Sequence, residues 1–320
     1  MIKALVTVTT DEIAERLQTY AHDSKQAFSK NTMKAIRADS NQYANWCTER
    51  GFSSLPTEPE TLRAYIKWGT QKYKPATVKR HLASIAHLHR AAELTDPTKH
   101  NKVKLAVRRM NRFKGTRQKQ ARGLTMPDVE RILASVEGTP RDTRDVAMIL
   151  IARDILARSS EMIALDITDI HFFEDGSGTV IIRKSKTDQE GQGAERWISP
   201  VTVKALKRWL EFSGIDKGAI FQSLTRGGNV KHGRRLATTD VYRSYQRLAQ
   251  ISGIEEITGH SCRVGMAQDL TAAGAEIGAI MQAGRWKSPE MPARYSERMA
   301  AGRGAVAQLY GIKGMGFSVR

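Results

Sequence analysis

A run of basic side chains over residues 99–122 constrains the fold of this chain more than any other stretch. It holds ten lysines and arginines and no acidic residue. Within it, the segment 115–123 (GTRQKQARG) has glycine at both ends, many charges and no apolar periodicity, which is typical of a linker. The sequence therefore predicts two domains, residues 1–114 and residues 124–320, joined by a basic linker.

The first domain is predicted to consist of helices. Thr9 and Glu12 form a capping-box pattern, in which each side chain can satisfy a free backbone N–H at the start of a helix. Apolar residues then recur at helical spacing, with breaks at Gly51 and Pro75. The predicted helices cover about residues 9–20, 31–50, 57–73, 76–94 and 98–113.

The second domain is predicted to be mostly helical, with one small antiparallel sheet. Its expected strands are residues 166–172, 179–184 and 196–199, joined by turns at 174–178 and 188–193. The segment 225–235 is rich in glycine and basic residues and is expected to be a loop. Its expected helices cover about residues 125–136, 139–156, 200–212 and 238–252, with one more starting near His260 and a short one before Trp286.

The charge of the chain indicates a polyanionic partner. Its formal net charge is +18 at pH 7. Residues 1–120 carry 23 lysines and arginines against 10 acidic residues, whereas residues 121–320 carry 28 against 23. A merely soluble basic protein would have the net charge without this clustering, so we interpret the cluster as a nucleic-acid interface. A basic linker between two helical domains can cross a phosphate backbone and let the domains clamp DNA.

Two segments carry side chains that suit DNA. The helix expected over residues 76–94 has a basic face, and a major groove accepts such a face because arginine can bond guanine and lysine can hold phosphates. The loop expected over residues 225–235 suits a phosphate backbone. An ordinary solvated face remains the alternative for each residue taken singly. The candidate contacts are Thr77, Arg80, His81, Arg226, Lys231, Arg234 and Arg235.

The sequence predicts neither a membrane protein nor a metalloprotein. No run approaches the roughly 18 apolar residues of a membrane span, and the start lacks a signal-peptide pattern, so a cytoplasmic protein is expected. No HExxH, DxD or CxxC motif is present, so neither a metal nor another cofactor is expected. Cys47 and Cys262 are expected in cores, although Cys262 lies between His260 and Arg263 and is also open to a role as a nucleophile.

Seven residues of the second domain follow one another in an order that suits phosphodiester chemistry. Cleavage passes through a pentacoordinate phosphorus with negative charge on its oxygens, so it needs fixed cationic donors, a nucleophile and an acid. The planar fork of an arginine holds two non-bridging oxygens, a tyrosine hydroxyl can attack phosphorus, and a lysine on a turn can protonate the leaving 5′ oxygen. The seven residues are Arg158, Glu161, Lys186, His260, Arg263, Trp286 and Tyr295.

Each of these residues taken singly has a simpler explanation. Tyr295 and Trp286 would ordinarily be packing residues, and Lys186 would be a solvated side chain. Arg158 would pair with Glu161 one helical turn on, because a buried arginine needs an anionic partner. The order of the whole set therefore carries the hypothesis of a phosphoryl-transfer site.

This ordered set resembles the tyrosine recombinase (phage integrase) family and, within it, the Cre type. Family members have ARxxE, a lysine on a β-turn, GHxxR, and Gly-x-Trp with a tyrosine nine residues on. The resemblance covers essentially the whole chain, and its motifs are together highly specific. They are residues 157–161 (ARSSE), 184–187 (KSKT), 259–263 (GHSCR), 284–286 (GRW) and Tyr295, with the Cre-like segments 44–47 (ANWC) and 79–82 (KRHL) in the first domain.

The resemblance implies the chemical roles of four residues. Tyr295 would be the nucleophile that forms a 3′-phosphotyrosine. Arg158 and Arg263 would hold the scissile phosphate. Lys186 would be the general acid for the 5′ oxygen.

The resemblance also implies supporting roles. His260 and Trp286 would bond phosphate oxygens and support proton transfer, and Glu161 would orient its neighbours. In the first domain it suggests Lys34 at the DNA, together with the three candidates already noted on the helix over residues 76–94. Arg285 departs from the pattern, because a small residue is common beside the tryptophan in the Cre type.

The implied fold is mainly α, a two-domain C-shaped clamp with a helical DNA-binding domain and a mostly helical catalytic domain that holds a small antiparallel sheet. The implied activity is site-specific recombination of double-stranded DNA at inverted-repeat sites, through a phosphotyrosine and a Holliday junction. Four subunits would hold two duplexes, with a C-terminal interaction helix near residues 302–309 that docks on a neighbour. The protein would be cytoplasmic and nucleoid-associated in a prokaryotic, phage or plasmid context.

Two alternatives are left open. A type IB topoisomerase shares this chemistry but acts on one duplex, so it would relax supercoils without pairing two sites. A non-catalytic DNA-binding regulator would keep the fold and form no phosphotyrosine.

Overall fold

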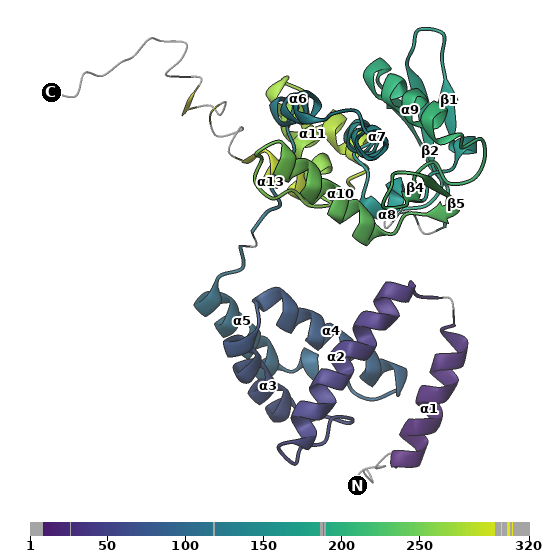
Figure 1. Cartoon of the computed structure of the whole chain (residues 1–320). Helices are drawn as coiled ribbons and strands as arrows, with labels where there is room; N and C mark the ends of the chain where they lie inside the picture. The colour runs from purple at the N-terminus through teal and green to yellow at the C-terminus, as the bar shows by residue number, and fades with distance from the viewer. Residues whose placement is uncertain are drawn as a thin grey trace, which may run out of the picture. The chain divides into compact units, whose positions relative to one another are not determined.

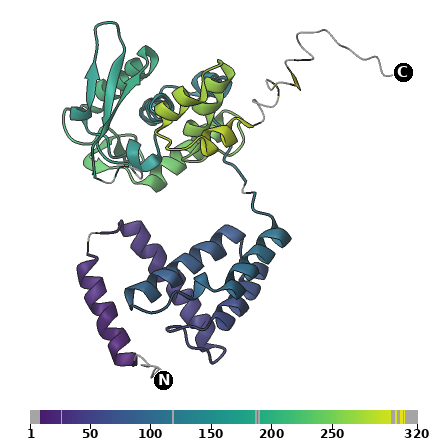
Figure 2. The same cartoon turned by 180° about the vertical axis from the view of Figure 1, so that it is seen from behind.

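The computed structural model divides into two compact units, each with its own core (Figures 1 and 2). The first unit ends at residue 118 and the second begins at Lys119, within the segment 115–123 where the sequence predicts a linker. The structure describes residues 9–25, 27–117, 119–185, 188, 190–297, 302, 306–307 and 309.

The described part of the first unit is helical, as the sequence predicts. Thr9 and Glu12 form the predicted capping box, since Glu12 N–H donates to Thr9 Oγ1 at 3.2 Å and Thr9 N–H donates to the Glu12 carboxylate at 2.7 Å. Pro75 begins a helix, a position where no N–H donor is needed. The elements are α1 (Thr10–Asp23), α2 (Lys30–Thr48), α3 (Pro59–Lys72), α4 (Pro75–Ala91), the 3-10 turn η1 (Pro97–Lys99) and α5 (Asn101–Lys114).

Aromatic side chains form the centre of the first unit. The buried ring of Tyr65 lies 4.8 Å from that of Tyr43 and 5.1 Å from that of Trp46, in the edge-on geometry that the ring quadrupole favours. Leu62 from α3 and Val78 from α4 belong to the same core. The apolar stripes predicted for α2, α3 and α4 therefore pack against one another.

The second unit is organised around a buried helix. Every residue of α7 from Ala147 to Arg153 is buried, because the helix contacts α9, α10 and α11 (Figure 1). This confirms the prediction that the apolar run in this helix is buried. The helices of the unit are α6 (Met126–Ser135), α7 (Pro140–Asp154), α8 (Ser159–Met162), α9 (Pro200–Ser213), α10 (Thr238–Ile251), α11 (Ser261–Ala272), α12 (Ile277–Gly284) and α13 (Glu290–Tyr295).

A three-stranded antiparallel sheet in the described part of this unit has the order β1 (Ile170–Phe172), β2 (Gly178–Ile182) and β3 (Ala194–Ile198). Its central residue Val180 pairs with Ile170 on one side and Arg196 on the other. The strand prediction is wrong for residues 166–169. Asp169 accepts the N–H of Asp166 at 2.8 Å and closes the 3-10 turn η2 (Ile167–Asp169), because aspartate side chains compete with strand hydrogen bonds.

A second, two-stranded sheet corrects the prediction of a loop over residues 225–235. Strands β4 (Gln222–Leu224) and β5 (Val230–Arg235) pair antiparallel with an irregularity in register. The side-chain oxygen of Gln222 accepts the N–H of Gly233 at 2.7 Å and ties the hairpin together. The sequence does not predict this hairpin, because β5 is rich in glycine and charged residues and lacks the alternation of apolar and polar residues that marks a half-buried strand.

Candidate active site

Four segments of the second unit bring most of the predicted site residues together. Arg158 lies at the N-terminal cap of α8 and His260 at that of α11, so Arg263 falls in the first turn of α11. Trp286 follows α12 after one residue, and Tyr295 is the last residue of α13. These residues meet because α11 contacts α7, α12 and α13.

Arg158 and Glu161 form a partly buried ion pair. Nη1 of Arg158 donates to Oε1 of Glu161 at 2.5 Å, and the backbone N–H of Arg158 donates to Oε2 at 3.0 Å. The Arg158 side chain is 19% exposed, whereas that of Glu161 is 2% exposed. The carboxylate therefore holds one edge of the arginine and leaves part of the guanidinium accessible to an anion.

Arg263 is a buried cation, with 1% of its surface exposed. One terminal nitrogen donates to the carbonyl of Leu156, and the guanidinium carbon lies 4.2 Å from the centroid of the Trp286 ring. Burial, together with repulsion from Arg158 and Arg285, lowers the pKa of Arg263 to about 9. Positive charge is thus concentrated away from water, where a bound anion would be stabilised most.

Glycines allow these elements to approach closely and explain two motif positions. A Cβ atom at Gly284 would lie 1.9 Å from the Trp286 ring, and the Gly284 carbonyl accepts a hydrogen bond from Arg263. A Cβ atom at Gly259 would lie 2.2 Å from Oγ of Ser159. A side chain at Gly284 would therefore displace the tryptophan ring, and one at Gly259 would displace the Ser159 hydroxyl.

Tyr295 lies against this group with 8% of its surface exposed. Its ring centroid is 5.8 Å from that of Trp286, at an interplanar angle of 65°. Its backbone carbonyl accepts hydrogen bonds from Nε2 of Gln120 at 3.3 Å and from Nε2 of Gln268 at 3.0 Å. The main chain of Tyr295 is therefore held by two amide side chains while its ring packs on the tryptophan.

The surroundings of the Tyr295 hydroxyl favour its protonated form. Burial raises the pKa of Tyr295 above its ordinary value, and the positive charges of Arg263 and Arg158 act in the opposite direction. The hydroxyl is therefore a weak nucleophile in this state and requires further help to lose its proton.

His260 and Lys186 complete the predicted set. His260 is exposed at the start of α11. Lys186 lies outside the described residues, so its predicted position is untested. Its described neighbours Ser185 and Asp188 form an antiparallel bridge, with Ser185 N–H donating to the Asp188 carbonyl at 3.0 Å. The Asp188 carboxylate also accepts the backbone N–H groups of residues 191–193.

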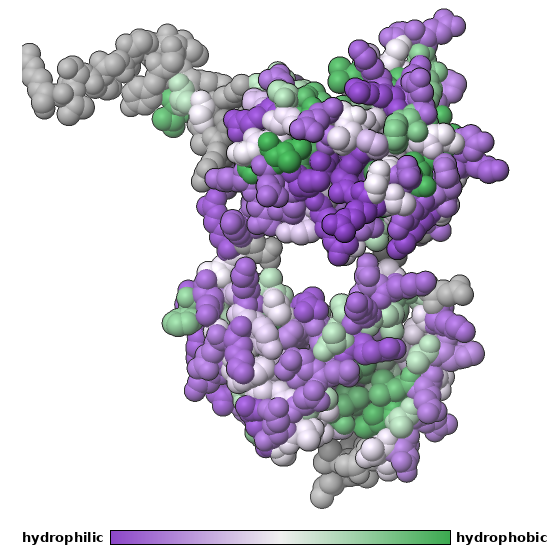
Figure 3. All heavy atoms as spheres, in the orientation of Figure 1, coloured by the Kyte–Doolittle hydropathy of each residue, from purple (hydrophilic) through white to green (hydrophobic). Residues whose placement is uncertain are grey.

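The candidate DNA contacts divide by exposure. His81 is buried, with Nδ1 2.8 Å from the Tyr65 hydroxyl and Nε2 3.5 Å from the Asp39 carboxylate, and the DNA contact expected of it stays a prediction. Arg235 is exposed but ion-paired with Asp166. Thr77 is half-buried. Arg80 is also exposed but pairs with Asp39 at 2.6 Å. The other exposed candidates are Lys34, Arg226, Lys231 and Arg234. Figure 3 shows hydrophilic side chains over α10 and the β4–β5 hairpin on the visible face of the second unit.

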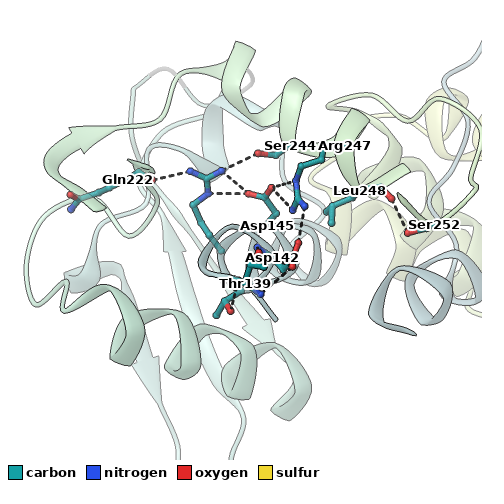
Figure 4. A network of polar contacts seen from close by, with 10 residues as sticks. Thr139, Asp142, Asp145, Gln222, Ser244, Arg247, Leu248 and Ser252 are labelled. Atoms are coloured by element: carbon teal, nitrogen blue, oxygen red, sulfur yellow. Dashed lines mark hydrogen bonds and ion pairs between the residues drawn. The ribbon is translucent and has the colours of Figure 1, made fainter. Parts of the chain in front are cut away.

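A basic pocket of about 320 Å³ beside this hairpin escaped the sequence analysis. Figure 4 shows the network beneath it, in which Arg247 donates to Asp142 at 2.7 Å and to Asp145 at 3.0 Å. Arg144 donates to Asp145 at 2.8 Å. The exposed cations that line the pocket are Arg141, Lys231, Arg234 and Arg243. Lys231 and Arg234 are candidates from the sequence, whereas Arg141 and Arg243 lie in two other segments, so no local pattern in the sequence could have joined the four.

Cys262 is fully buried, and burial raises the pKa of its thiol to about 11, so the structure supports its role in the core. Cys47 is also buried. Among the described residues, no group of three or more histidine, cysteine, aspartate or glutamate side chains is placed to hold a metal ion. None of the described helices combines the length and apolar character needed to cross a membrane. Of the predicted C-terminal interaction helix, only residues 302, 306–307 and 309 are described.

Comparison with known proteins identifies the family of this site. The model of the phage integrase family matches residues 122–301, a range that contains all seven predicted catalytic positions. The chain belongs to the phage integrase family. The resemblance inferred from the motifs, to the tyrosine recombinases, is thereby confirmed.

Relatives of this integrase family member cover most of its length. Recombinase Cre of Escherichia phage P1 is 28% identical over 326 residues, which cover 95% of this chain and 94% of Cre. An integrase/recombinase XerD homolog of Selenomonas ruminantium is 30% identical over 281 residues, which cover 84% of this chain and 82% of the homolog.

Solved structures show the same fold. The Tn1549 transposon integrase in complex with transposon right end DNA has a TM-score of 0.62 at 16% identity, over 90% of this chain and 98% of that one. A lambda integrase dimer bound to a COC′ core site has a TM-score of 0.60 at 15% identity, over 91% of this chain and 95% of that one. The expected mainly α fold with a small antiparallel sheet is therefore confirmed, and the two-stranded sheet adds to it.

Proposed function

We propose that this protein is a site-specific DNA recombinase that breaks and rejoins strands through a 3′-phosphotyrosine on Tyr295. One arrangement carries the proposal. The buried Arg263 stacks on Trp286, and Trp286 packs edge-on against Tyr295, so a cation and a hydroxyl flank one indole ring. Arg158 is close enough to act on the pKa of Tyr295 and is partly open to solvent. A phosphodiester between the two arginines would meet the hydroxyl as its nearest nucleophile.

The reaction is a transesterification, so the phosphodiester is converted to a phosphotyrosine ester and is not hydrolysed. The Tyr295 oxygen forms a bond to phosphorus, the bond from phosphorus to the 5′ oxygen breaks, and a proton from Lys186 converts the leaving oxygen to a hydroxyl. A 5′ hydroxyl from a second strand then attacks the phosphotyrosine and releases Tyr295. The arginines supply the positive charge that stabilises the transition state, and no nucleotide is consumed.

In the proposal, the DNA phosphate itself helps to activate the Tyr295 hydroxyl. Burial keeps the Tyr295 hydroxyl protonated, and the arginines at positions 158, 263 and 285 have one carboxylate, that of Glu161, among them. A bound phosphate would neutralise those cations and bring one of its oxygens to the hydroxyl. In the proposal, His260, which caps α11 beside this group, bonds a phosphate oxygen and assists the transfer of the proton.

The proposal extends to the DNA and to the assembly. The basic stretch over residues 99–122 and the exposed cations of both units would follow the phosphate backbone of a double-stranded site. Recombination joins two sites, and each site has two strands to cut. We therefore propose four copies of the chain on two duplexes, with inverted repeats in each site and a Holliday junction between the two rounds of exchange.

Covalent trapping on a library of random DNA duplexes tests the function and reveals the target site in one experiment. The protein is incubated with the library, the mixture is denatured, and DNA that stays attached to protein is sequenced. Attached fragments should share inverted repeats around a short spacer. The Tyr295→Phe variant should bind the recovered site and form no adduct. Adducts that survive this substitution would exclude Tyr295 as the nucleophile.

A matched control removes the hydroxyl of another tyrosine. Tyr242 is 44% exposed on α10 and donates to Glu256 at 3.0 Å, so it is the more accessible hydroxyl of the two. The Tyr242→Phe variant should form adducts as the wild type does. The recovered site then separates recombination from relaxation. A recombinase exchanges strands between two duplexes that carry the site, whereas a relaxing enzyme removes supercoils from a plasmid without exchange.

A further inference from the structure

Arg285 is a partly buried arginine to which the family motifs assign no role. We propose that it is a positioning residue for strand cleavage, and that it acts through Glu161 on Arg158. The inference rests on the proposed function, because it concerns the same scissile phosphate. Three observations on this chain carry it: the backbone of Arg285, the two acceptors of its guanidinium, and the charge around Glu161.

The backbone of Arg285 adopts a conformation that favours glycine. Its φ is 55° and its ψ is 45°, in the left-handed region, at the C-terminal cap of α12. This conformation ends the helix and places Trp286 on Arg263, and a glycine would allow it without steric cost. An L-residue at such a position opposes the local preference of the chain. The presence of arginine here indicates that its side chain performs a function that glycine cannot.

The guanidinium of Arg285 joins two elements of the site. Its side chain is 9% exposed. Nη1 donates to the carbonyl of Ile155 at 3.0 Å, and Nη2 donates to Oε2 of Glu161 at 2.6 Å. Ile155 is the C-terminal cap of α7, where unsatisfied carbonyls and the helix dipole favour a cation. Only a planar fork with several donors can bridge a carbonyl and a carboxylate in this way.

Glu161 is held by two arginines, one at each oxygen. Oε1 accepts from Arg158 and Oε2 accepts from Arg285, so the carboxylate cannot rotate without losing both contacts. Arg285 thus holds Glu161 in place, and Glu161 in turn sets the direction of the Arg158 guanidinium. A catalytic cation must be oriented before the phosphate arrives, because its alignment then costs nothing in the transition state.

The second arginine also changes the charge that Arg158 presents. A pair of Arg158 and Glu161 alone would be neutral and would attract an anion weakly. With Arg285 on the other oxygen, the three side chains carry a formal charge of +1, and Arg263 raises the total to +2. A phosphorane in the transition state carries more negative charge than the phosphodiester from which it forms. The extra cation therefore favours the transition state over the bound substrate.

Rates of covalent adduct formation at saturating DNA test the inference. Arg285→Gly suits the left-handed backbone and should fold, yet it removes both hydrogen bonds. We expect its single-turnover cleavage rate to fall by about tenfold to a hundredfold, the range known for outer-shell partners of metal sites. Its affinity for DNA should change by less than about threefold. Arg285→Lys keeps the charge without the fork and should recover part of the rate.

A control and a double-mutant cycle separate positioning from a structural effect. Glu93 has a φ of 54° and is exposed in the first unit, so Glu93→Gly relaxes a similar backbone and should leave cleavage unchanged. If Arg285 acts through Glu161, adding Arg285→Gly to Glu161→Gln should lower the rate little further. Rate losses that multiply in the double variant, or an Arg285→Gly rate within about threefold of wild type, would overturn the inference.

The outcomes also separate this inference from the proposed function. If the wild type forms no phosphotyrosine on any DNA, the proposed function fails and the role of Arg285 fails with it. If the wild type forms adducts and the Arg285 variants cleave normally, the function stands and only the role of Arg285 is excluded. Thermal unfolding of each variant identifies loss of fold. If Arg285→Gly does not fold, the comparison of Arg285→Lys with wild type, alone and with Glu161→Gln, decides the question.

Discussion

The guanidinium of Arg263 stacks on the indole of Trp286, with 4.2 Å between the guanidinium carbon and the ring centroid. The contact has two consequences for the site. It holds the planar fork of a buried arginine in one orientation, and cation–π attraction is strongest when both partners are shielded from water. It also sets the position of Tyr295, because the Trp286 ring that stacks on Arg263 packs edge-on against the Tyr295 ring.

A single methyl group at Gly284 should disrupt this stack. Its Cβ would lie 1.9 Å from the Trp286 ring, so Gly284→Ala must move the tryptophan or the end of α12. We expect loss of stability of about 1–3 kcal/mol, as for other overpacked sites, and loss of covalent adduct. Urea unfolding and adduct formation measure the two effects.

Gly278 provides the matched control in the same helix. A Cβ atom there would meet nothing within 4 Å. Gly278→Ala should be neutral or stabilise the protein by up to about 1 kcal/mol, because alanine favours helix more than glycine does. Equal losses from both substitutions would show that α12 tolerates no change and that the contact with Trp286 is not the cause.

The Tyr295 hydroxyl should ionise above the ordinary range of tyrosine in the protein without DNA. Burial raises the pKa, and Arg263 and Arg158 lower it in part. Removal of a cation must therefore raise the pKa further, so Arg263→Met should move the ionisation of Tyr295 to higher pH. Ultraviolet difference titration of each protein against its Tyr295→Phe counterpart isolates this residue. A shift to lower pH would contradict the assigned contacts.

Lys186→Ala should slow cleavage, and a substrate with a better 5′ leaving group should restore it. A 5′-bridging phosphorothiolate needs no proton as it leaves, so the variant should recover most of the lost rate. Rates of adduct formation on the two substrates test this. Lys184→Ala removes a neighbouring exposed lysine and should show neither the defect nor the rescue. A Lys186→Ala defect that persists on the phosphorothiolate would exclude the role as general acid.

Stability at low pH should depend on Asp142. Its burial raises the pKa, but the hydrogen bonds from Thr139 and Arg247 outweigh that effect and leave the pKa below its ordinary value. A carboxylate with a lowered pKa stabilises the fold above its unfolded pKa, and this stability is lost as the pH falls through the folded value. Asp142→Asn should therefore cost about 1.5–3 kcal/mol at pH 7 and much less below pH 3.

Urea unfolding at both pH values measures this difference. Asp216→Asn changes an exposed carboxylate of the same unit and should alter neither value by more than about 0.5 kcal/mol. If Asp142→Asn costs the same at both pH values, its cost arises from packing and not from its charge.

Local patterns in the sequence were sufficient for most of the fold. The capping box at Thr9, the buried run in α7 and the three strands of the first sheet follow from periodicity and turn chemistry alone. The burial of single side chains was harder to predict. One residue on a helix turns the side chain by about 100°, and this step separates the exposed Arg80 from the buried His81.

The sequence proposes members of a site, but it does not predict the contacts between them. Motif order indicated Arg158, Arg263 and Tyr295, because their spacing is a property of the chain. The bridge from Arg285 to Glu161 joins residues 124 apart in sequence and depends on a left-handed backbone, and neither property has a local pattern. The sequence marked Arg285 only as an unusual neighbour of the tryptophan.

The hydrogen bond between Gln120 and the carbonyl of Tyr295 places the nucleophile next to the joint between the two units. The second unit begins at Lys119, so Gln120 is its second residue. A residue at the start of the second unit thus holds the end of α13, and one hydrogen bond fastens two points of the chain that lie 175 residues apart.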